Sequence, residues 1–406
     1  MASITKLKTN ATVTPSNLES LFRMALLKRE NASSAAHVVE ALEALKELMN
    51  KAMEYQEYEV AGKIMEHLGT LLLQQGCWDE AAAILEQLNY THCLGRSIIN
   101  YDVNLPALAT SQSERRSFKN NNIVHVYKNV LTDEVLGKFK TAFHKNSPFW
   151  TEHKYPRSYF SYSHRLTKVG NNNLIEQLAR YVQNIISVKF PKVRDAKVVE
   201  WWAHRRPHCH AHQMHFDSDN EGEGSEIRNP IASTILYLSP EGIGGPTLVT
   251  TQTLHSKTLA KNGWLIFPSE NCLGVFDGRY LHGVIPGKGF VERKENVNDN
   301  RRITLMLAFW DEIEIRDNPV PGASRLFPPL AKPGGELNQP RSTYTWQNLL
   351  APVDHQLFAG MRDSYDIDKG EVPIVEVSGP IWEPLVPGSG KEVMPRYDDC
   401  FQYPVM

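Results

Sequence analysis

The stretch of the chain that decides the fold runs from residue 198 to residue 310 and reads, segment by segment, VVEWWAHRR (198–206), ASTILYLS (232–239), GPTLVTT (245–251), GWLIFP (263–268), LHGVIP (281–286) and RRITLMLAFW (301–310). These segments are short and rich in β-branched and aromatic side chains, which is typical of strands. Glycine and proline between them favour turns. A series of short strands at this spacing predicts a jelly-roll barrel, also called a double-stranded β-helix.

One further strand and two helices are expected just before this series. Ile123–Tyr127 alternates its side chains as a strand does. Thr132–Phe143 predicts a helix opened by Thr132, and Leu174–Ile186 predicts a second helix. The sequence therefore predicts the α+β class, with a double-stranded β-helix domain over residues 118–315.

Residues 1–110 are expected to form a separate α-helical domain. Ser16-Asn17-Leu18-Glu19 has the form of a capping box, and apolar side chains recur at helical spacing from Val38 to Met49. Residues 58–88 resemble one tetratricopeptide-type helix pair, in which small residues let two helices approach closely. One pair cannot form a solenoid. Two roles therefore stay open: a bundle that caps the barrel, and a docking module for a protein partner.

The last part of the chain, residues 316–406, differs in character. It holds 13 of the 24 prolines, counted from Pro319 to Pro404. Proline disfavours regular helices and central strands. We expect an extended, proline-rich segment that packs on the barrel.

Composition excludes several classes of function. The 406 residues are 41% hydrophobic and carry a formal net charge of −2, so no cationic surplus favours nucleic acid. No apolar run is long enough to cross a membrane, and the N-terminus lacks the apolar core of a secretory signal. The 5 cysteines are scattered without any CxxC motif, which argues against a disulfide framework. A cytoplasmic location is expected.

Two short motifs suggest a metal centre. His215-Phe216-Asp217 lies early in the strand series, and His282-Gly283 lies in a later strand. Residues two apart on an extended chain point to the same face, so His215 and Asp217 can act together. Two imidazoles and one carboxylate form the 2-His-1-carboxylate triad that binds Fe(II) and leaves positions open for substrates.

The final strand adds an anion-binding pair. Arg302 and Thr304 share one face of this strand, whereas Ile303 and Leu305 share the other. The strand is apolar on both faces, so we expect it to be buried. A buried guanidinium requires an anion, and beside a hydroxyl it can bind a carboxylate through two hydrogen bonds.

With these residues in place, residues 197–310 resemble the Fe(II)- and 2-oxoglutarate-dependent dioxygenases, and most closely their prolyl-4-hydroxylase-like branch. The resemblance implies that His215, Asp217 and His282 are the catalytic iron ligands. It implies that Arg302 binds the distal carboxylate of 2-oxoglutarate, and that Thr304, Tyr237 and Thr247 are further cofactor contacts. Fe(II) and 2-oxoglutarate are the expected cofactors, with ascorbate as a further candidate.

The same resemblance implies a reaction. Oxidative decarboxylation of 2-oxoglutarate with dioxygen would be coupled to hydroxylation of an unactivated C–H bond in a protein residue or a small metabolite. Asp217 favours hydroxylation over halogenation, because a Gly or Ala there would open a halide site. Arg302 lies further from His282 than in the family, and prolyl hydroxylases commonly have Lys at the anchoring position. The implied specificity therefore does not extend to peptidyl proline.

Two other interpretations stay open. His210-Ala211-His212 has the HxH spacing of a cupin, with Asp217 in place of the usual glutamate; otherwise the histidines from His204 to His212 form a polar loop that leads into the metal strand. The second alternative is a non-catalytic helical-repeat interaction protein with a vestigial barrel. Residues 218–226 and 288–302 are charged and are expected to be solvated loops, with the latter as an alternative substrate lid.

Limited proteolysis tests the first domain boundary. We predict cleavage between Asn100 and Asn122, because the polar stretch TSQSERRSFKNNN (110–122) has the composition of a linker. Mass spectrometry of the fragments locates the cut. Resistance of this stretch, with cleavage inside residues 58–88 instead, would show that the boundary is misplaced.

Overall fold

The computed structural model describes residues 13–104, 123–152, 161–166, 173–219, 227–291, 301–315, 324–327, 345–359, 374–377 and 379–385. The helices are η1 (Pro15–Asn17), α1 (Leu18–Glu30), α2 (Ala35–Glu54), α3 (Tyr58–Gln74), α4 (Trp78–Gln87), α5 (Arg96–Ile99), α8 (Asp133–Ala142), α9 (Pro148–Glu152), α10 (Leu174–Ile186), η2 (Pro191–Asp195), η4 (Thr345–Leu350) and α11 (Gln356–Ala359). The strands are β1 (His92–Leu94), β2 (Val124–Tyr127), β3 (Ser161–Arg165), β4 (Val198–Pro207), β5 (His212–His215), β6 (Ala232–Tyr237), β7 (Thr247–Thr250), β8 (Gly263–Ile266), β9 (Cys272–Phe276), β10 (His282–Val284), β11 (Arg301–Trp310), β12 (Ser324–Leu326), β13 (Ile374–Glu376) and β14 (Trp382–Pro384).

The strands form two main sheets. One has 7 strands in the order β12-β3-β4-β11-β6-β9-β2, and the other has 5 in the order β13-β8-β7-β10-β5. Neighbours pair antiparallel except β12 and β3, which are parallel. The mixture of helices with antiparallel sheets agrees with the expected α+β class. A closed barrel is not shown by the described strands, which form these two sheets and a separate 2-stranded sheet of β1 and β14.

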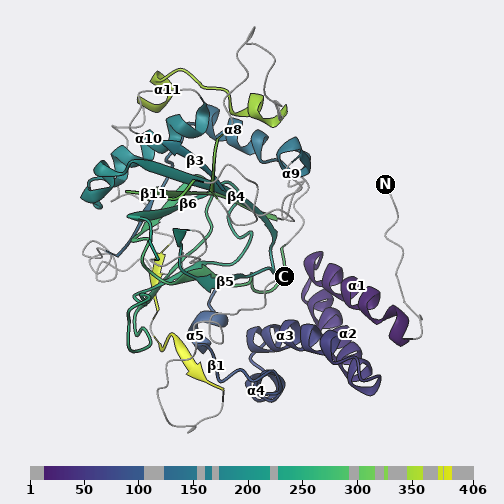
Figure 1. The fold of residues 1–406 in the computed structure, drawn as a ribbon. Coiled ribbons are helices and arrows are strands. Elements are labelled where there is room, and N and C mark those ends of the chain that lie inside the picture. The colour runs from purple at the N-terminus through teal and green to yellow at the C-terminus, as the bar shows by residue number, and fades with distance from the viewer. Residues whose placement is uncertain are drawn as a thin grey trace.

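The sheets and helices stack in layers (Figure 1). Helices α8 and α10 cover the outer face of the 7-stranded sheet, and the 5-stranded sheet lies against its inner face. Strand β11 shows how alternation builds this arrangement. Leu305, Leu307 and Phe309 belong to the core beneath the helices, whereas Met306 belongs to the core between the sheets. The expectation that this strand is buried on both faces is confirmed.

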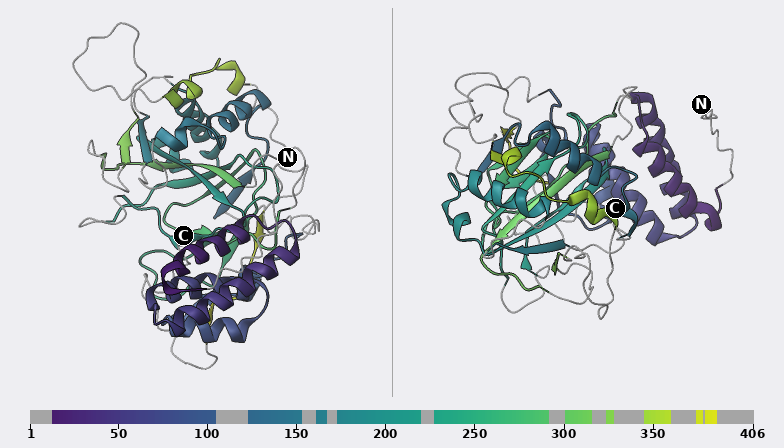
Figure 2. Two further views of the ribbon diagram at one scale, coloured as in Figure 1. Left: turned by 90° about the vertical axis from the view of Figure 1, so that its right-hand side faces the viewer. Right: turned by 90° about the horizontal axis from the view of Figure 1, so that it is seen from above.

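The N-terminal helices pack against the other face of the 5-stranded sheet and lie below it in the left view of Figure 2. Helices α1–α4 pack in sequence order, and their apolar side chains share one core with sheet residues such as Leu248, Leu265 and Leu281. The capping box at the chain start differs from the expected one. The backbone N–H of Thr14 donates to Asn17 Oδ1 at 2.8 Å, so Thr14, rather than Ser16, occupies the N-cap position before η1.

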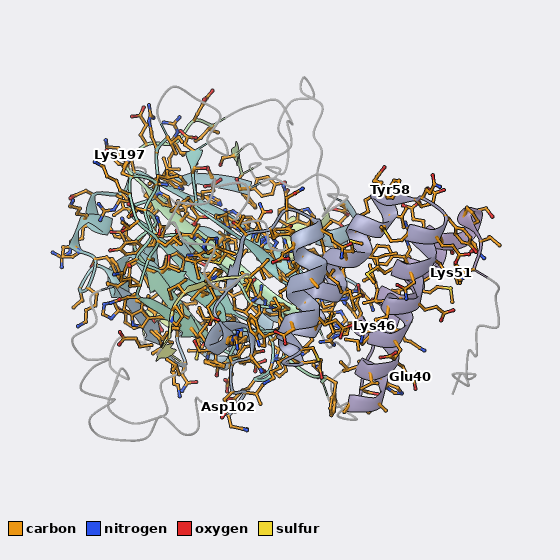
Figure 3. All side chains as sticks on the ribbon, turned by 90° about the horizontal axis from the view of Figure 1, so that it is seen from below. Glu40, Lys46, Lys51, Tyr58, Asp102 and Lys197 are labelled. Atoms are coloured by element: carbon orange, nitrogen blue, oxygen red, sulfur yellow. The ribbon has the colours of Figure 1, made fainter. Side chains whose placement is uncertain are left out.

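The outer face of the helices is charged. Lys46 pairs with Glu80 at 2.8 Å, and Lys51 pairs with Glu54 at 2.7 Å. Figure 3 shows Glu40, Lys46 and Lys51 on the helices that lie away from the sheets. Water screens such exposed pairs, so they contribute little to stability. The buried side of the helices therefore accounts for their attachment.

Several expected segments lie wholly or partly outside the described residues. These are the linker at 105–122, the acidic segment at 220–226, the candidate lid at 292–300 and most of 316–406. The described parts of the C-terminal region do pack on the rest of the chain. Strand β13 pairs with β8, β14 pairs with β1, and Trp346 of η4 is buried in the core beneath α8 and α10. The division into three domains stays a proposal. No described helix is both long and apolar enough to cross a membrane.

Two glycines of α3 provide a matched test of helix packing. A Cβ at Gly69 would lie 2.7 Å from Leu85 Cδ2 of α4, whereas a Cβ at Gly62 would lie 3.7 Å from Leu88 Cδ2. Both Gly→Ala changes gain about 1 kcal/mol of helix propensity. Only Gly69→Ala also overpacks the helix pair, which costs about 1–3 kcal/mol. We predict that Gly62→Ala raises the thermal unfolding midpoint above that of wild type. The midpoint of Gly69→Ala should be lower than that of Gly62→Ala. Equal midpoints would contradict the close packing of α3 on α4.

Candidate metal centre

The sheet register brings His215, Asp217 and His282 together. His215 ends β5 and pairs directly with His282, the first residue of β10. The imidazole Nε2 atoms of His215 and His282 lie 3.6 and 3.7 Å from Asp217 Oδ1. One ligand atom from each of these residues lies within 4.8 Å of the others, so the group can hold a metal ion.

The glycine after His282 explains this close pairing. A Cβ at Gly283 would lie 2.6 Å from Met214 Sδ and 3.0 Å from Gln213 O, both on β5. A side chain at this position would therefore push β10 away from β5. The His-Gly pair in the sequence thus has a steric cause.

Backbone contacts fix the tautomers of both imidazoles. His215 Nδ1 lies 2.9 Å from Gln213 O, and His282 Nδ1 lies 2.9 Å from Tyr280 O. A carbonyl oxygen only accepts hydrogen bonds, so each Nδ1 carries the proton and donates it. In the neutral ring, Nε2 then carries the lone pair and faces the carboxylate. Two such nitrogens beside a carboxylate oxygen form a ligand set that can bind a metal ion.

Burial and charge favour the metal-binding protonation states. Burial raises the pKa of Asp217, but the neighbouring His282, His215 and Ser233 outweigh it and lower the pKa to about 2. Ser233 Oγ donates to Asp217 Oδ2 at 2.6 Å, which leaves Oδ1 directed at the imidazoles. Burial lowers the pKa of His282 to about 4. At neutral pH the group therefore offers an ionised carboxylate and a neutral imidazole of His282.

Arg302 lies on the same cavity as the triad. Its side chain is buried, with 3% of its surface exposed. Burial lowers the pKa of Arg302 to about 10, so the guanidinium stays charged at neutral pH. Its described hydrogen bond is a long one, from Nη1 to Gly245 O at 3.4 Å. Among the described residues no carboxylate forms an ion pair with it, and its titratable neighbours are Tyr237, Arg206 and Tyr101.

The other expected cofactor contacts surround Arg302. Thr304 lines the cavity, and its buried Oγ1 has no hydrogen-bond partner among the described residues. Thr247 also lines the cavity and lies 2.9 Å from the hydroxyl of Tyr237. Tyr237 is fully buried in the core between the sheets, behind Thr247. The structure thus brings Arg302, Thr304 and Thr247 to the cavity, with Tyr237 reaching it through Thr247.

The cavity contains residues that the motifs did not identify. Its wall is completed by aromatic, aliphatic and imidazole side chains, among them Trp202, His204, His212, Ile235, Phe276 and Met306. The expectation of a polar loop from His204 to His212 is wrong for His204, which lies buried on β4 beside Thr304 of β11. Burial holds the pKa of His204 and of His212 well below the usual range, so both are neutral. The alternation along VVEWWAHRR places Trp202 and His204 on the face shared with Arg302, once the pairing of β4 with β11 is known.

The cupin interpretation is not supported by the geometry. His210 Nε2 donates to Glu30 Oε1 of α1 at 2.9 Å. His210 therefore faces the N-terminal helices, whereas His212 lines the cavity. The two do not form an HxH ligand pair, and the described cluster that can hold a metal uses His215 instead.

Comparisons with known proteins found neither a matching family model nor a matching curated protein. The solved structures that align with the chain include prolyl hydroxylases and other 2-oxoglutarate-dependent oxygenases. A Pseudomonas putida prolyl-4-hydroxylase is 12% identical, with a TM-score of 0.31 over 48% of this chain and 91% of that chain. The collagen prolyl hydroxylase of Paramecium Bursaria Chlorella virus-1 is 14% identical, with a TM-score of 0.29 over 47% and 96%. HygX from Streptomyces hygroscopicus, with nickel and 2-oxoglutarate bound, is 11% identical, with a TM-score of 0.29 over 53% and 95%. These TM-scores are too low to carry an argument, so the chemistry rests on the chain's own residues.

Metal affinity tests the ligand cluster and the hydrogen bond from Ser233 that orients Asp217. We predict that His282→Ala and Asp217→Ala abolish metal retention, because each removes one of three ligands. Ser233→Ala should lower the affinity by roughly 10- to 100-fold, the range for residues that orient a ligand. Anaerobic competition of Fe(II) against a chelator measures these constants. Ser187→Ala removes a buried hydroxyl that donates to Asn184 O at the end of α10, and it should leave the affinity unchanged. Wild-type affinity in Asp217→Ala would exclude this metal centre.

Proposed function

We propose that the chain is an Fe(II)- and 2-oxoglutarate-dependent oxygenase that hydroxylates an unactivated C–H bond of an organic or peptidyl substrate. The observation that carries this proposal is that one cavity holds a candidate cation site and a candidate anion site. The cation site is the group of ligand atoms from His215, Asp217 and His282, and the anion site is the buried guanidinium of Arg302.

Fe(II) suits the cation site. Two neutral imidazoles and one carboxylate are the ligand set of non-haem Fe(II) oxygenases, and three protein ligands leave coordination positions free. When bound, Fe(II) activates dioxygen for oxidative decarboxylation of the keto acid and oxidation of the substrate. Asp217 supports hydroxylation, because its carboxylate occupies the position that a halide would need.

2-Oxoglutarate suits the anion site. Its keto acid end can bind a metal, and its other carboxylate can then reach a cation deeper in the cavity. Arg302 offers paired N–H donors in a plane, and Thr304 offers a hydroxyl beside it. Removing one partner from a buried ion pair costs about 3–5 kcal/mol, which supports a strong preference for a diacid.

The remaining walls exclude water and position the substrate. Trp202, Ile235, Phe276 and Met306 are apolar side chains that line the cavity around the triad. Apolar walls limit side reactions and leave orientation to a few polar groups. We expect residues 146–170 and 218–230, together with the N-terminal helices, to set selectivity. The two loops lie only partly within the described chain, so the substrate is proposed as a class.

Succinate formation tests the proposal as a whole. The purified chain, loaded anaerobically with Fe(II), should bind 2-oxoglutarate by calorimetry and release succinate when oxygen is admitted. Iron bound at one ion per chain is expected from the single described cluster. A chain that binds Fe(II) but shows neither 2-oxoglutarate binding nor succinate would contradict this function.

Substitutions at adjacent arginines test the anchor. Arg302→Lys keeps the charge but loses the planar pair of donors, so the KM for 2-oxoglutarate should rise while Fe(II) affinity stays the same. Arg302→Ala should act more strongly in the same direction. Arg301 faces away from the cavity, with Nη2 at 3.5 Å from Glu30 Oε2, so Arg301→Ala should change KM little. The reverse pattern would place the wrong arginine in the site.

A further inference from the structure

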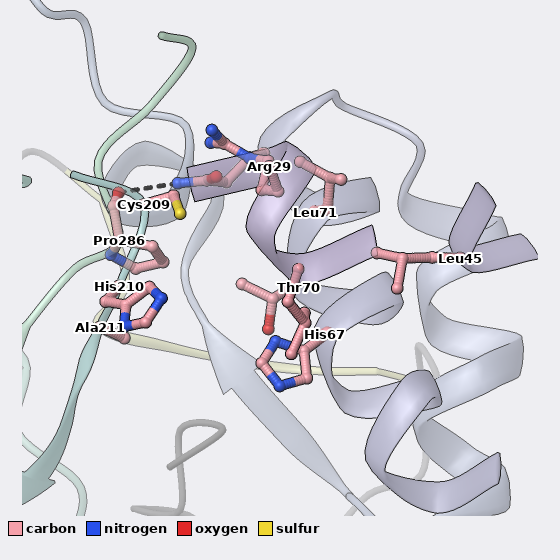
Figure 4. Close-up of a pocket in the computed structure, with 11 residues that line it drawn as sticks. Arg29, Leu45, His67, Thr70, Leu71, Cys209, His210, Ala211 and Pro286 are labelled. Atoms are coloured by element: carbon pink, nitrogen blue, oxygen red, sulfur yellow. Dashed lines mark hydrogen bonds between the residues drawn. The ribbon is translucent and has the colours of Figure 1, made fainter. Parts of the chain in front are cut away.

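The segment that follows β10 is held by the N-terminal helices. Gln74 Nε2 of α3 donates to Pro286 O at 2.8 Å, and Arg29 Nη2 of α1 donates to Gly287 O at 3.2 Å. The dashed line in Figure 4 is the hydrogen bond from Gln74 to Pro286, with Arg29 and Cys209 close to it. The backbone N–H of Lys288 donates to the hydroxyl of Tyr101 at 2.9 Å. Three consecutive residues after a proposed metal-ligand strand therefore depend on residues far earlier in the chain.

His208 connects this segment to a glycine turn. Its Nε2 lies 3.1 Å from Lys288 O, and its own carbonyl accepts from Gly287 N at 2.9 Å. Its Nδ1 accepts from the backbone N–H of Gly244 at 2.9 Å. Since Lys288 O can only accept, Nε2 carries the proton and Nδ1 is free to accept from Gly244. Both nitrogens of a buried imidazole thus serve to join two backbone segments.

The glycine turn in turn lies directly against Arg302. Gly244 has φ +90, and a Cβ there would lie 2.5 Å from Arg302 Cδ and 2.9 Å from Arg302 Cβ. The turn continues to Gly245, whose carbonyl accepts from Arg302 Nη1. The position of this turn therefore limits where the guanidinium can lie.

We infer that His208 is a positioning residue for the 2-oxoglutarate anchor: it fixes the Gly244–Gly245 turn against Arg302 and ties that turn to the N-terminal helices through residues 286–288. The inference rests on the proposed function for the role of Arg302 and extends it by giving the helices a part in co-substrate binding. His208 does not line the described cavity, so it acts through its neighbours.

Histidine suits this position because it supplies a donor and an acceptor on one rigid ring. Burial lowers the pKa of His208 to about 4, so the ring is neutral at neutral pH and Nδ1 stays an acceptor. Two substitutions separate its two bonds. Asn places its amide oxygen near the Nδ1 position and keeps the acceptor for Gly244. Gln places its amide nitrogen near the Nε2 position and keeps only the donor to Lys288.

The experiment compares His208→Gln and His208→Asn in the full chain. His208→Gln should weaken 2-oxoglutarate binding to the Fe(II)-loaded protein by about tenfold, the effect expected from one lost hydrogen bond. It should also speed hydrogen–deuterium exchange in peptides that cover residues 240–248. His208→Asn should keep both values within about twofold of wild type, because Asn keeps the acceptor for Gly244 and the carbonyl of residue 208 still accepts from Gly287 N. Fe(II) affinity should be unchanged in both variants, which separates this role from a general loss of structure. His255→Gln changes an exposed histidine and is the matched control.

A remote substitution tests the link to the helices. Gln74→Leu removes the donor to Pro286 O and should weaken 2-oxoglutarate binding in the wild-type background. In the His208→Gln background it should add little, because the connection between residues 286–288 and the turn is already broken. Full additivity of the two changes would overturn the connection through His208.

The outcomes separate this inference from the proposed function. If wild type binds no 2-oxoglutarate, the proposed function fails, and the exchange of residues 240–248 still decides whether His208 holds the turn. If Arg302→Lys weakens 2-oxoglutarate binding but His208→Gln does not, the function stands and the positioning role is overturned. Equal exchange at residues 240–248 in the Gln and Asn variants also overturns it.

Discussion

The rest of the site depends on the direct pairing of His215 with His282 across β5 and β10. Antiparallel pairing places the two imidazoles side by side, with ring centroids 4.3 Å apart. Each Nδ1 donates to a backbone carbonyl, so Nε2 is the ring nitrogen that faces Asp217 in both imidazoles. The register of two short strands therefore creates the geometry of the candidate metal centre.

The second constraint is the buried charge of Arg302, which forms no ion pair with a carboxylate among the described residues. A guanidinium out of water costs several kcal/mol unless an anion accompanies it. The fold tolerates Arg302 because strand alternation directs Leu305 and Leu307 into the core beneath the helices and leaves Arg302 and Thr304 facing the cavity. The proposed chemistry and the folding of the strand thus use opposite faces of β11. The apolar face packs in the core, and the polar face is the one proposed to bind the co-substrate.

The N-terminal helices contribute more than a cover. Their apolar side chains merge into one core with the 5-stranded sheet, and Arg29, Gln74 and Tyr101 form hydrogen bonds with residues 286–288. A polar side chain buried at such a junction stabilises it only when its hydrogen bonds are made. A continuous series of hydrogen bonds therefore runs from the helices through residues 286–288 and His208 to the glycine turn beside Arg302. The sequence left two roles open for the helices, a cap and a docking module, and the structure shows them packed on the 5-stranded sheet.

The sequence by itself determined the local features of this protein. Period-two alternation predicted β11 as a buried strand with Arg302 and Thr304 on one face, and helical spacing predicted α3, α4, α8 and α10. These patterns depend on neighbouring residues, which one sequence displays in full. Only the tertiary structure decided which distant segments meet: the pairing of β5 with β10, the separation of the sheets, the burial of His204, and the contact of His210 with Glu30. The physical reason is that strand partners and buried hydrogen bonds are chosen by the packing of the whole core, and no local pattern of side chains encodes that choice.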